Sequence, residues 1–174
     1  MEQEKNTKKD NLMREIFMEK LVISCGGIKD DLNKGIKLLE KVSGKKAARM
    51  KTVKRIPGFG IRPTMEVGGM VTLRGEEATE LLVRLLAAIE NEISKKQIAD
   101  NHFSFGIKEY IEIPGEKYDR DIGMRGFKVT LVFARKGKRV VRKKIKKGKL
   151  GKRQVVKKEE IIKFMEDSFQ TDIY

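Results

Sequence analysis

The chain has 174 residues, of which 39% are hydrophobic and 37% are charged, and its formal net charge is +15. This composition supports one compact domain with a buried core, and the charge points to a polyanionic partner, either nucleic acid or an anionic membrane surface. The single cysteine excludes an internal disulfide framework, and no apolar run reaches the roughly 20 residues of a membrane span, so we expect a cytoplasmic protein.

Hydrophobic periodicity and turn residues predict five strands and three helices. In chain order these are a strand over 15–24, a helix capped by Asp30 or Asp31 and extending to Val42, strands over 47–55 and 65–75, a helix over 76–96, strands over 103–113 and 126–134, and a helix over 159–169. Because the strands are grouped and are joined unevenly by helices, the predicted fold class is α+β rather than doubly wound α/β.

The segment 76–96 has the strongest helical pattern. Acids occupy its first turn and lysines its last, as the helix dipole favours. Its apolar residues recur at helical spacing: Leu81, Leu82, Leu85, Ala88, Ile89 and Ile93. No internal repeat divides the chain, so we expect a single domain over 11–174 after a disordered tail over 1–10.

Two segments carry the whole positive excess. Residues 134–158, called the basic arm below, contain 14 Lys or Arg residues and no acid. Residues 45–62 contain another 7 bases and no acid, which leaves 19 bases and 25 acids in the rest of the chain. A charge run of mixed sign is usually a solvated face, but single-sign runs repel themselves until phosphates neutralise them. We therefore expect both segments to bind a polyanion.

The sequence offers no catalytic pattern. Gly58–Gly60 is the nearest approach to a phosphate-binding loop, but it lacks the Gly-Lys-Ser/Thr ending and opens no helix. His102 is the only histidine and has no metal-ligating companions. An acidic cluster of Glu116, Asp119 and Asp121 either holds a cation or forms a solvated turn. We expect no enzyme activity, no cofactor, no metal and no small-molecule substrate.

Several short blocks in order resemble the family of the fifth large-subunit ribosomal protein, whose members bind 5S rRNA. They are N-L-M-R-E-I-F-M-E-K-L-V-I-S (Asn11 to Ser24), S-G-K (Ser43 to Lys45), K-T-V-K-R-I-P-G-F-G-I-R (Lys51 to Arg62), V-T-L-R-G (Val71 to Gly75), N-H-F-S-F-G-I-K-E (Asn101 to Glu109) and Y-D-R-D-I-G-M-R-G (Tyr118 to Gly126). The resemblance covers residues 11–174. The basic arm and the helix after it resemble the archaeal and eukaryotic branch, because bacterial members end soon after the last long strand.

The resemblance implies a mostly antiparallel sheet with helices packed on one face, a projecting loop and a basic C-terminal arm. It implies a ribosome-associated structural protein in the central protuberance of the large subunit, with no membrane contact. The implied partners are 5S rRNA, the large-subunit rRNA, the companion 5S-binding ribosomal protein and P-site tRNA.

The family's rRNA contacts align with Ser24, Lys45 and Thr72. Thr72 matches the family residue, whereas bacterial members have Asn and Gln in place of Ser24 and Lys45. Cationic side chains complete the expected rRNA-binding set: Arg14, Lys20, Arg49, Arg74, Arg139, Arg142, Lys143, Lys146, Lys149, Lys152 and Arg153.

The family's tRNA-contacting loop aligns with residues 54–64. Its expected contact residues are Lys54, Arg55, Pro57, Gly58, Phe59, Gly60 and Arg62. Prolines and glycines shape such a loop, the cations meet phosphates, and Phe59 either stacks on a base or anchors the loop by packing. Two other classes remain open on the residues alone: an RNA-modifying enzyme, which would need a methyl-donor or nucleotide pocket, and a DNA-compacting protein, which would bind duplex DNA as well as 5S rRNA.

Overall fold

The computed structural model describes residues 11–174, so the predicted tail over 1–10 lies outside the described part of the chain. Its strands are β1 (Ile16–Gly26), β2 (Ala48–Lys51), β3 (Glu66–Leu73), β4 (Glu92–Ile93), β5 (Ile98–Ala99), β6 (His102–Ile107), β7 (Phe127–Arg135) and β8 (Asp172–Ile173). Six of them form one sheet in the order β2-β3-β1-β7-β6-β5, with every neighbouring pair antiparallel, while β4 and β8 form a short parallel pair.

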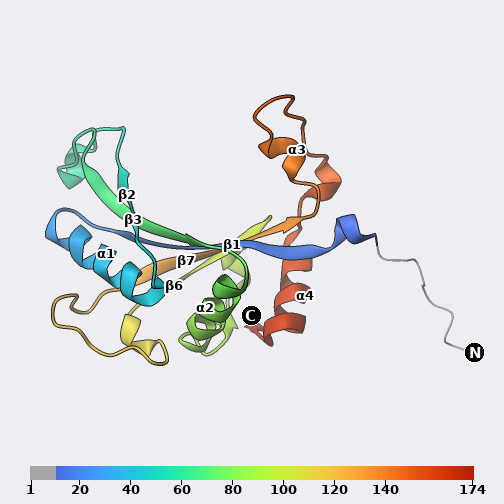
Figure 1. Ribbon diagram of the computed structural model, residues 1–174. Helices are drawn as coiled ribbons and strands as arrows, with labels where there is room; N and C mark the ends of the chain where they lie inside the picture. Colours follow the sequence, from blue (N-terminus) through green and yellow to red (C-terminus); the bar gives the residue numbers. More distant parts are fainter. Residues whose placement is uncertain (1–10) are drawn as a thin grey trace, which may run out of the picture.

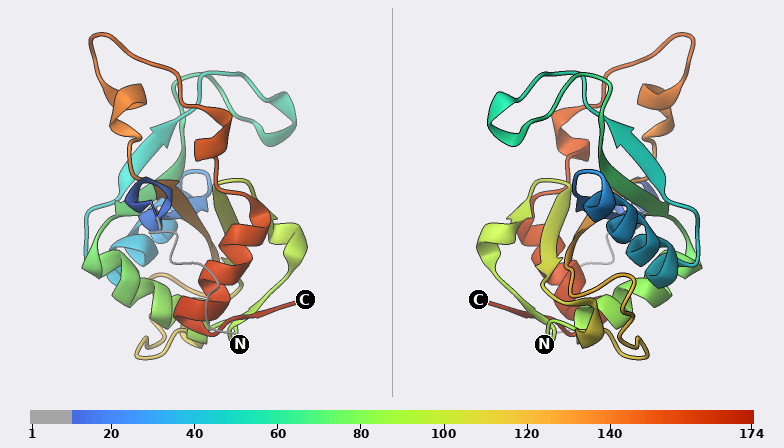
Figure 2. Two further views of the ribbon diagram at one scale, coloured as in Figure 1. Left: turned by 90° about the vertical axis from the view of Figure 1, so that its right-hand side faces the viewer. Right: turned by 90° about the vertical axis from the view of Figure 1, so that its left-hand side faces the viewer.

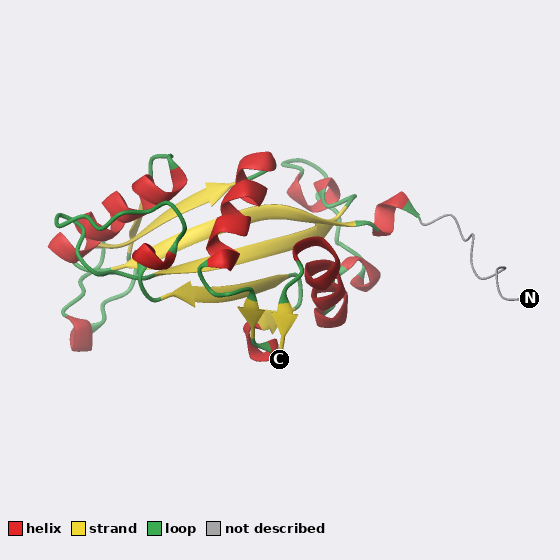
Figure 3. Ribbon diagram, turned by 90° about the horizontal axis from the view of Figure 1, so that it is seen from below, coloured by secondary structure: helices red, strands yellow, loops and turns green. Residues whose placement is uncertain are grey.

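The helices are α1 (Asp30–Ser43), α2 (Glu76–Ala87), α3 (Arg139–Arg142) and α4 (Lys158–Phe169). Short 3-10 turns cover Leu12–Arg14, Pro57–Phe59, Lys95–Gln97, Tyr110–Glu112 and Lys152–Gln154. Helices α1, α2 and α4 all lie against one face of the sheet (Figures 1 and 3), so the predicted α+β class with helices on one face is confirmed.

The core lies between these helices and the sheet. Strand residues alternate between the two faces, and those on the helix side are apolar and almost fully buried. They include Leu21, Ile23, Val71, Leu73, Phe103, Phe105, Val129, Leu131 and Phe133. Leu39 and Leu82 close this layer from α1 and α2. Burying one such side chain contributes about 1.5–3 kcal/mol, so the sheet-to-helix layer holds the domain together.

Helix α1 packs very close to the sheet because glycine stands at two contact points. A Cβ on Gly35 would lie 2.7 Å from the Cys25 sulfur, and one on Gly69 would lie 3.0 Å from Ile36. Any larger side chain there would push the helix outward. Burial beneath α1 raises the pKa of the Cys25 thiol, which keeps this cysteine protonated at neutral pH.

The helix predicted over 76–96 is too long. Helix α2 ends at Ala87, and Glu90 and Asn91 then adopt left-handed backbone conformations with φ of 55° and 60°. Ile93 remains buried, but in β4 rather than in the helix. The apolar stripe therefore continues past the helix end because the same core accepts side chains from both segments.

Other boundaries also differ from the predictions. The strand predicted over 103–113 ends at Ile107, since Tyr110 turns inward and is fully buried, and β2 ends at Lys51 instead of residue 55. The predicted cap of α1 is wrong as well. Lys29 occupies the N-cap position without a side-chain hydrogen bond, while Asp30 and Asp31 lie in the first turn, where they face the positive end of the helix dipole.

Candidate nucleic-acid interface

Within residues 11–174, one face of the sheet has no helix of the body packed against it, and it is called the open face below. Its side chains are small, hydroxylated, apolar or basic, and none is acidic. They include Lys20, Val22 and Ser24 of β1, Met70 and Thr72 of β3, His102 and Ser104 of β6, and Lys128, Thr130 and Val132 of β7. The strand register aligns Val22 with both Thr72 and Thr130, and the Ser104 and Thr130 hydroxyls lie 3.2 Å apart. The row across the centre of the open face therefore carries the hydroxyls of Thr72, Thr130 and Ser104, with Val22 between the two threonines.

The loop between β2 and β3 projects from one end of the open face (Figures 1 and 2). Backbone hydrogen bonds hold it as a narrow hairpin: Ile56 and Ile61 exchange two bonds of 3.0 and 3.1 Å, and the Thr64 N–H donates to the Thr52 carbonyl at 2.8 Å. Gly60 closes the tip with a left-handed φ of 64°, which glycine adopts without strain.

Phe59 lies at the tip of this hairpin with 72% of its surface exposed. The alternative that it anchors the loop by packing is therefore wrong. Lys54, Arg55 and Arg62 are also exposed, and none of them makes an ion pair within residues 11–174. The tip thus presents one aromatic ring and three exposed cations.

The basic arm projects from the other end, on the same side of the sheet as the β2–β3 loop (Figure 2). Its two ends are fastened together at the sheet. The buried Arg135 donates to the Arg153 carbonyl at 3.0 Å and pairs with Glu160 of α4. Asn101 forms two hydrogen bonds with the Val156 backbone, accepting from its N–H at 2.9 Å and donating to its carbonyl at 3.0 Å. The arm therefore leaves the domain and returns to it at the same place, where its two ends are held together.

Glu160 is held ionised at this base. Partial burial alone would raise the pKa of Glu160, but the N–H of Lys157 and the Arg135 guanidinium both stabilise the carboxylate and lower its pKa overall.

Considering residues 11–174, most cations of the arm are free to meet a ligand. Arg135, Lys136, Lys138 and Arg142 pair with acids of the domain. The following bases of the arm have no ion-pair partner among the described residues: Arg139, Lys143, Lys144, Lys146, Lys147, Lys149, Lys152, Arg153, Lys157 and Lys158. Of the cations predicted to bind rRNA in the arm, Arg142 alone is paired with an acid of the described part of the chain.

The structure brings only some of the predicted rRNA-binding residues together. Lys20, Ser24 and Thr72 share the open face, while Arg14 is exposed just before β1 and Arg74 just after β3.

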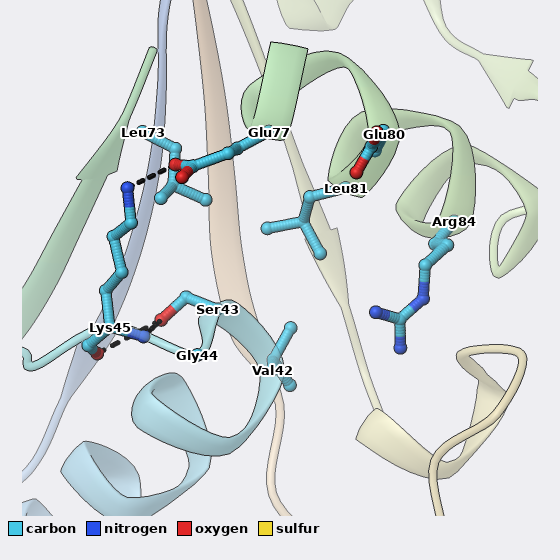
Figure 4. Close-up of a pocket in the computed structure, with 9 residues that line it drawn as sticks. All are labelled: Val42, Ser43, Gly44, Lys45, Leu73, Glu77, Glu80, Leu81 and Arg84. Atoms are coloured by element: carbon cyan, nitrogen blue, oxygen red, sulfur yellow. Dashed lines mark hydrogen bonds and ion pairs between the residues drawn. The ribbon is translucent and has the colours of Figure 1, made fainter. Parts of the chain in front are cut away.

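Lys45 and Arg49 instead face the helix side. Lys45 pairs with Glu77 of α2 across a shallow pocket of mixed charge (Figure 4). Arg49 pairs with Glu66 at 2.8 Å and donates to Asn33 of α1 at 3.2 Å.

The acidic cluster near residue 119 is paired with bases of the helices. Glu116 lies 3.1 Å from Arg84 of α2. Asp119 and Asp121 each lie 3.8 Å from a lysine of α1, Lys41 and Lys37 respectively. These pairs link the loop before β7 to the helical layer. They explain the acidic cluster through pairing with basic side chains and not through binding of a metal cation.

The residues that fasten the arm are not predicted as functional by the sequence. Asn101 belongs to the N-H-F-S-F-G block, and the structure gives it a left-handed φ of 65° just before β6. In the sequence, Arg135 is one more base of the arm. Glu19, which pairs with Lys138 and Arg142, is an acid among apolar strand residues and gives no periodic signal.

Comparison with known proteins agrees with this arrangement. The family model of the ribosomal L5 C-terminus matches residues 66–164, from β3 into α4. The large ribosomal subunit protein uL5 of Nanoarchaeum equitans is 39% identical over 164 residues, covering 92% of this chain and 97% of that protein. The protein belongs to the ribosomal L5 family. The uL5 proteins of Archaeoglobus fulgidus (39% identical, 95% of this chain and 94% of that one) and Tetrahymena thermophila (36%, 96% and 98%) extend the match to a second archaeon and a eukaryote.

Membership in the L5 family makes the protein a structural constituent of the large ribosomal subunit and not an enzyme, as predicted. The predicted archaeal and eukaryotic character is confirmed by the organisms of these relatives. The predicted ribosome-associated location in the cytoplasm is confirmed because these relatives are large ribosomal subunit proteins. Within residues 11–174, no helix is long and apolar enough to cross a bilayer.

Proposed function

We propose that this L5 family member binds 5S rRNA on the open face, links it to the large-subunit rRNA in the central protuberance, and contacts P-site tRNA through residues 54–64. The companion 5S-binding ribosomal protein would be its neighbour there. The observation that carries the proposal is that the β2–β3 loop and the basic arm rise on the same side of the sheet, at opposite ends of the open face (Figure 1). The open face is thus flanked at both ends by segments with exposed cations.

This arrangement suits a folded RNA better than a protein or a membrane. An A-form helix presents 2′-hydroxyls and phosphates across a wide, shallow minor groove. Ser24, Thr72 and Thr130 supply hydroxyls that donate to or accept from ribose, while Lys20 and Lys128 are suited to phosphates. The free cations of the arm then reach phosphates beyond the edge of the sheet and release their counterions.

The β2–β3 loop is assigned to tRNA because its contacts are few. Three cations and one exposed ring are too small a set to hold a large rRNA, but they suit a ligand that leaves at every translation cycle. Phe59 is free to stack on an unpaired base or ribose, and Lys54, Arg55 and Arg62 are exposed in the same hairpin.

The open face is tested by titrating 5S rRNA with the parent protein and with Thr72→Val. The substitution keeps the side-chain volume and removes one hydroxyl, so we expect a loss of about 0.5–1.5 kcal/mol in binding with an unchanged fold. Thr79→Val is the matched control, because Thr79 is exposed on α2 on the opposite side of the domain. If Thr72→Val and Thr79→Val bind 5S rRNA with equal affinity, the open face is not the surface that binds this RNA.

The same titration with duplex DNA decides between RNA binding and DNA compaction. Comparable affinities for duplex DNA and 5S rRNA at moderate salt would support a DNA-compacting protein and contradict the proposal.

A further inference from the structure

Glu19 is an almost buried carboxylate at the point where the basic arm meets the open face. Only 7% of its side chain is exposed. Its strand is irregular at this position: in the pairing of β1 with β7, Met18 faces Phe133 and Lys20 faces Val132, so Glu19 is an extra residue without a partner. Such a bulge redirects a side chain that would otherwise follow the alternation of the strand.

The redirected carboxylate binds the root of the arm at two points. One oxygen accepts from the Lys138 ammonium and the other pairs with the Arg142 guanidinium. Lys138 is the N-cap of α3 and Arg142 is its last residue, so a spacing of four puts both on one face of that helical turn. Two contacts on one face fix the rotation of α3 about its axis. Arg139 and Lys143 lie on a different face and stay exposed.

Helix α3 needs such a tether. It has four residues, whereas isolated helices shorter than about 12–15 residues are marginal in water. Its neighbours in sequence are cations that repel one another, and its own valines, Val140 and Val141, are exposed and do not bury it against the domain. Glu15, which pairs with Lys136, is an exposed contact and contributes less than a buried one.

We propose that Glu19 is a positioning residue that holds the root of the basic arm in one orientation, so that the free cations of the arm are aligned beside the open face before RNA arrives. This inference rests on the proposed function in one respect, that the arm binds RNA. The opposite role is that Glu19 competes with phosphate for Lys138 and Arg142. The two roles predict opposite changes in affinity when the carboxylate is removed.

The first measurement needs no RNA. Limited trypsin digestion of the full chain is followed at the arm for the parent and for Glu19→Gln, Glu19→Met and Glu15→Gln. We expect cleavage within 143–149 to be about tenfold faster in both Glu19 variants, because cleavage tracks the population of loosened arm. Glu15→Gln should cleave at nearly the parent rate. Glu19→Met serves as a second variant that retains the buried volume without the charge, should the glutamine variant fold poorly.

The second measurement is 5S rRNA affinity, using RNA transcribed in vitro. Ordering a loosened arm on binding has an entropic cost, so we expect about tenfold weaker binding by both Glu19 variants. The dependence of affinity on salt should stay at the parent slope, because no RNA-facing cation has been removed. Glu19→Asp, which retains the charge on a shorter side chain, should recover part of the loss.

The outcomes separate this inference from the proposed function. Unchanged cleavage, or unchanged or tighter RNA binding by Glu19→Gln and Glu19→Met, would overturn the positioning role. If the parent itself fails to bind 5S rRNA, the proposed function fails, and the digestion still decides whether Glu19 fixes the arm.

Discussion

Removing charge from the arm should weaken RNA binding in a way that salt reveals. Lys143, Lys146, Lys149 and Lys152 are exposed and make no ion pair within the described chain, so replacing all four by glutamine leaves the fold intact. Each lost phosphate contact lowers the slope of log affinity against log salt by about 0.7–0.9, so four lost contacts should lower it by about 3–4. The assay is filter binding or anisotropy with 5S rRNA over a series of salt concentrations.

The matched control removes the same charge from residues that belong neither to the open face nor to the basic arm. Lys34 on α1, Lys95 and Lys96 after β4, and Lys163 on α4 are all unpaired among residues 11–174 and lie away from the open face. Their replacement by glutamine lowers the net charge by the same four units and should leave the slope almost unchanged. Equal slopes for the two quadruple variants would show that total charge, and not the placement of the arm, governs binding, and the reasoning would be refuted.

Two further predictions concern the loop and the base of the arm. Replacing Arg55, Phe59 and Arg62 by alanine should leave 5S rRNA affinity unchanged and speed tRNA release from the P site of reconstituted ribosomes; loss of 5S binding with normal tRNA residence would reverse the two assignments. The pKa of Glu160 is lower in the folded protein than in the unfolded chain. Its pair with Arg135 therefore stabilises the fold above the unfolded-state pKa, and this stabilisation is lost as the pH falls through the folded-state pKa. As the pH is lowered from 6 to 3, the thermal unfolding temperature should therefore fall less steeply for Glu160→Gln than for the parent. Parallel plots of unfolding temperature against pH for the two proteins would contradict this.

The sequence predicts the charge segregation and the sheet better than it predicts the site. Strands with alternating apolar residues and single-sign basic runs are local patterns, so they can be recognised without knowledge of the partner segment. The positions of Lys45 and Arg49 are not local. Arg49 faces α1 because its register partner is Gly69, on the helix side of β3, and nothing near it in the chain encodes that register. An alignment to the family therefore cannot show that these two side chains pair with acids of the domain.

Three-dimensional proximity also explains why Glu19 and Asn101 are not predicted from the sequence. Glu19 acts through bases more than a hundred residues later, and its bulge is visible only when β7 is placed beside β1. Asn101 fastens Val156, which lies 55 residues further along the chain. By contrast, the β2–β3 loop is predicted correctly as a projection, since prolines and glycines shape it within a dozen residues.

The order of strands in the sheet has a consequence for synthesis. The central seam joins β1 to β7, and Ile16 pairs with Arg135, so the two partners leave the translating ribosome about 120 residues apart. At roughly 5–20 residues per second, β1 waits about 6–24 s for its second neighbour. Strand β3 pairs with one edge of β1 earlier, but the other edge of β1 stays unpaired. An unpaired strand edge can form hydrogen bonds with a strand of another chain, which leads to aggregation. The nascent protein is therefore most prone to aggregation in the interval before its last long strand emerges.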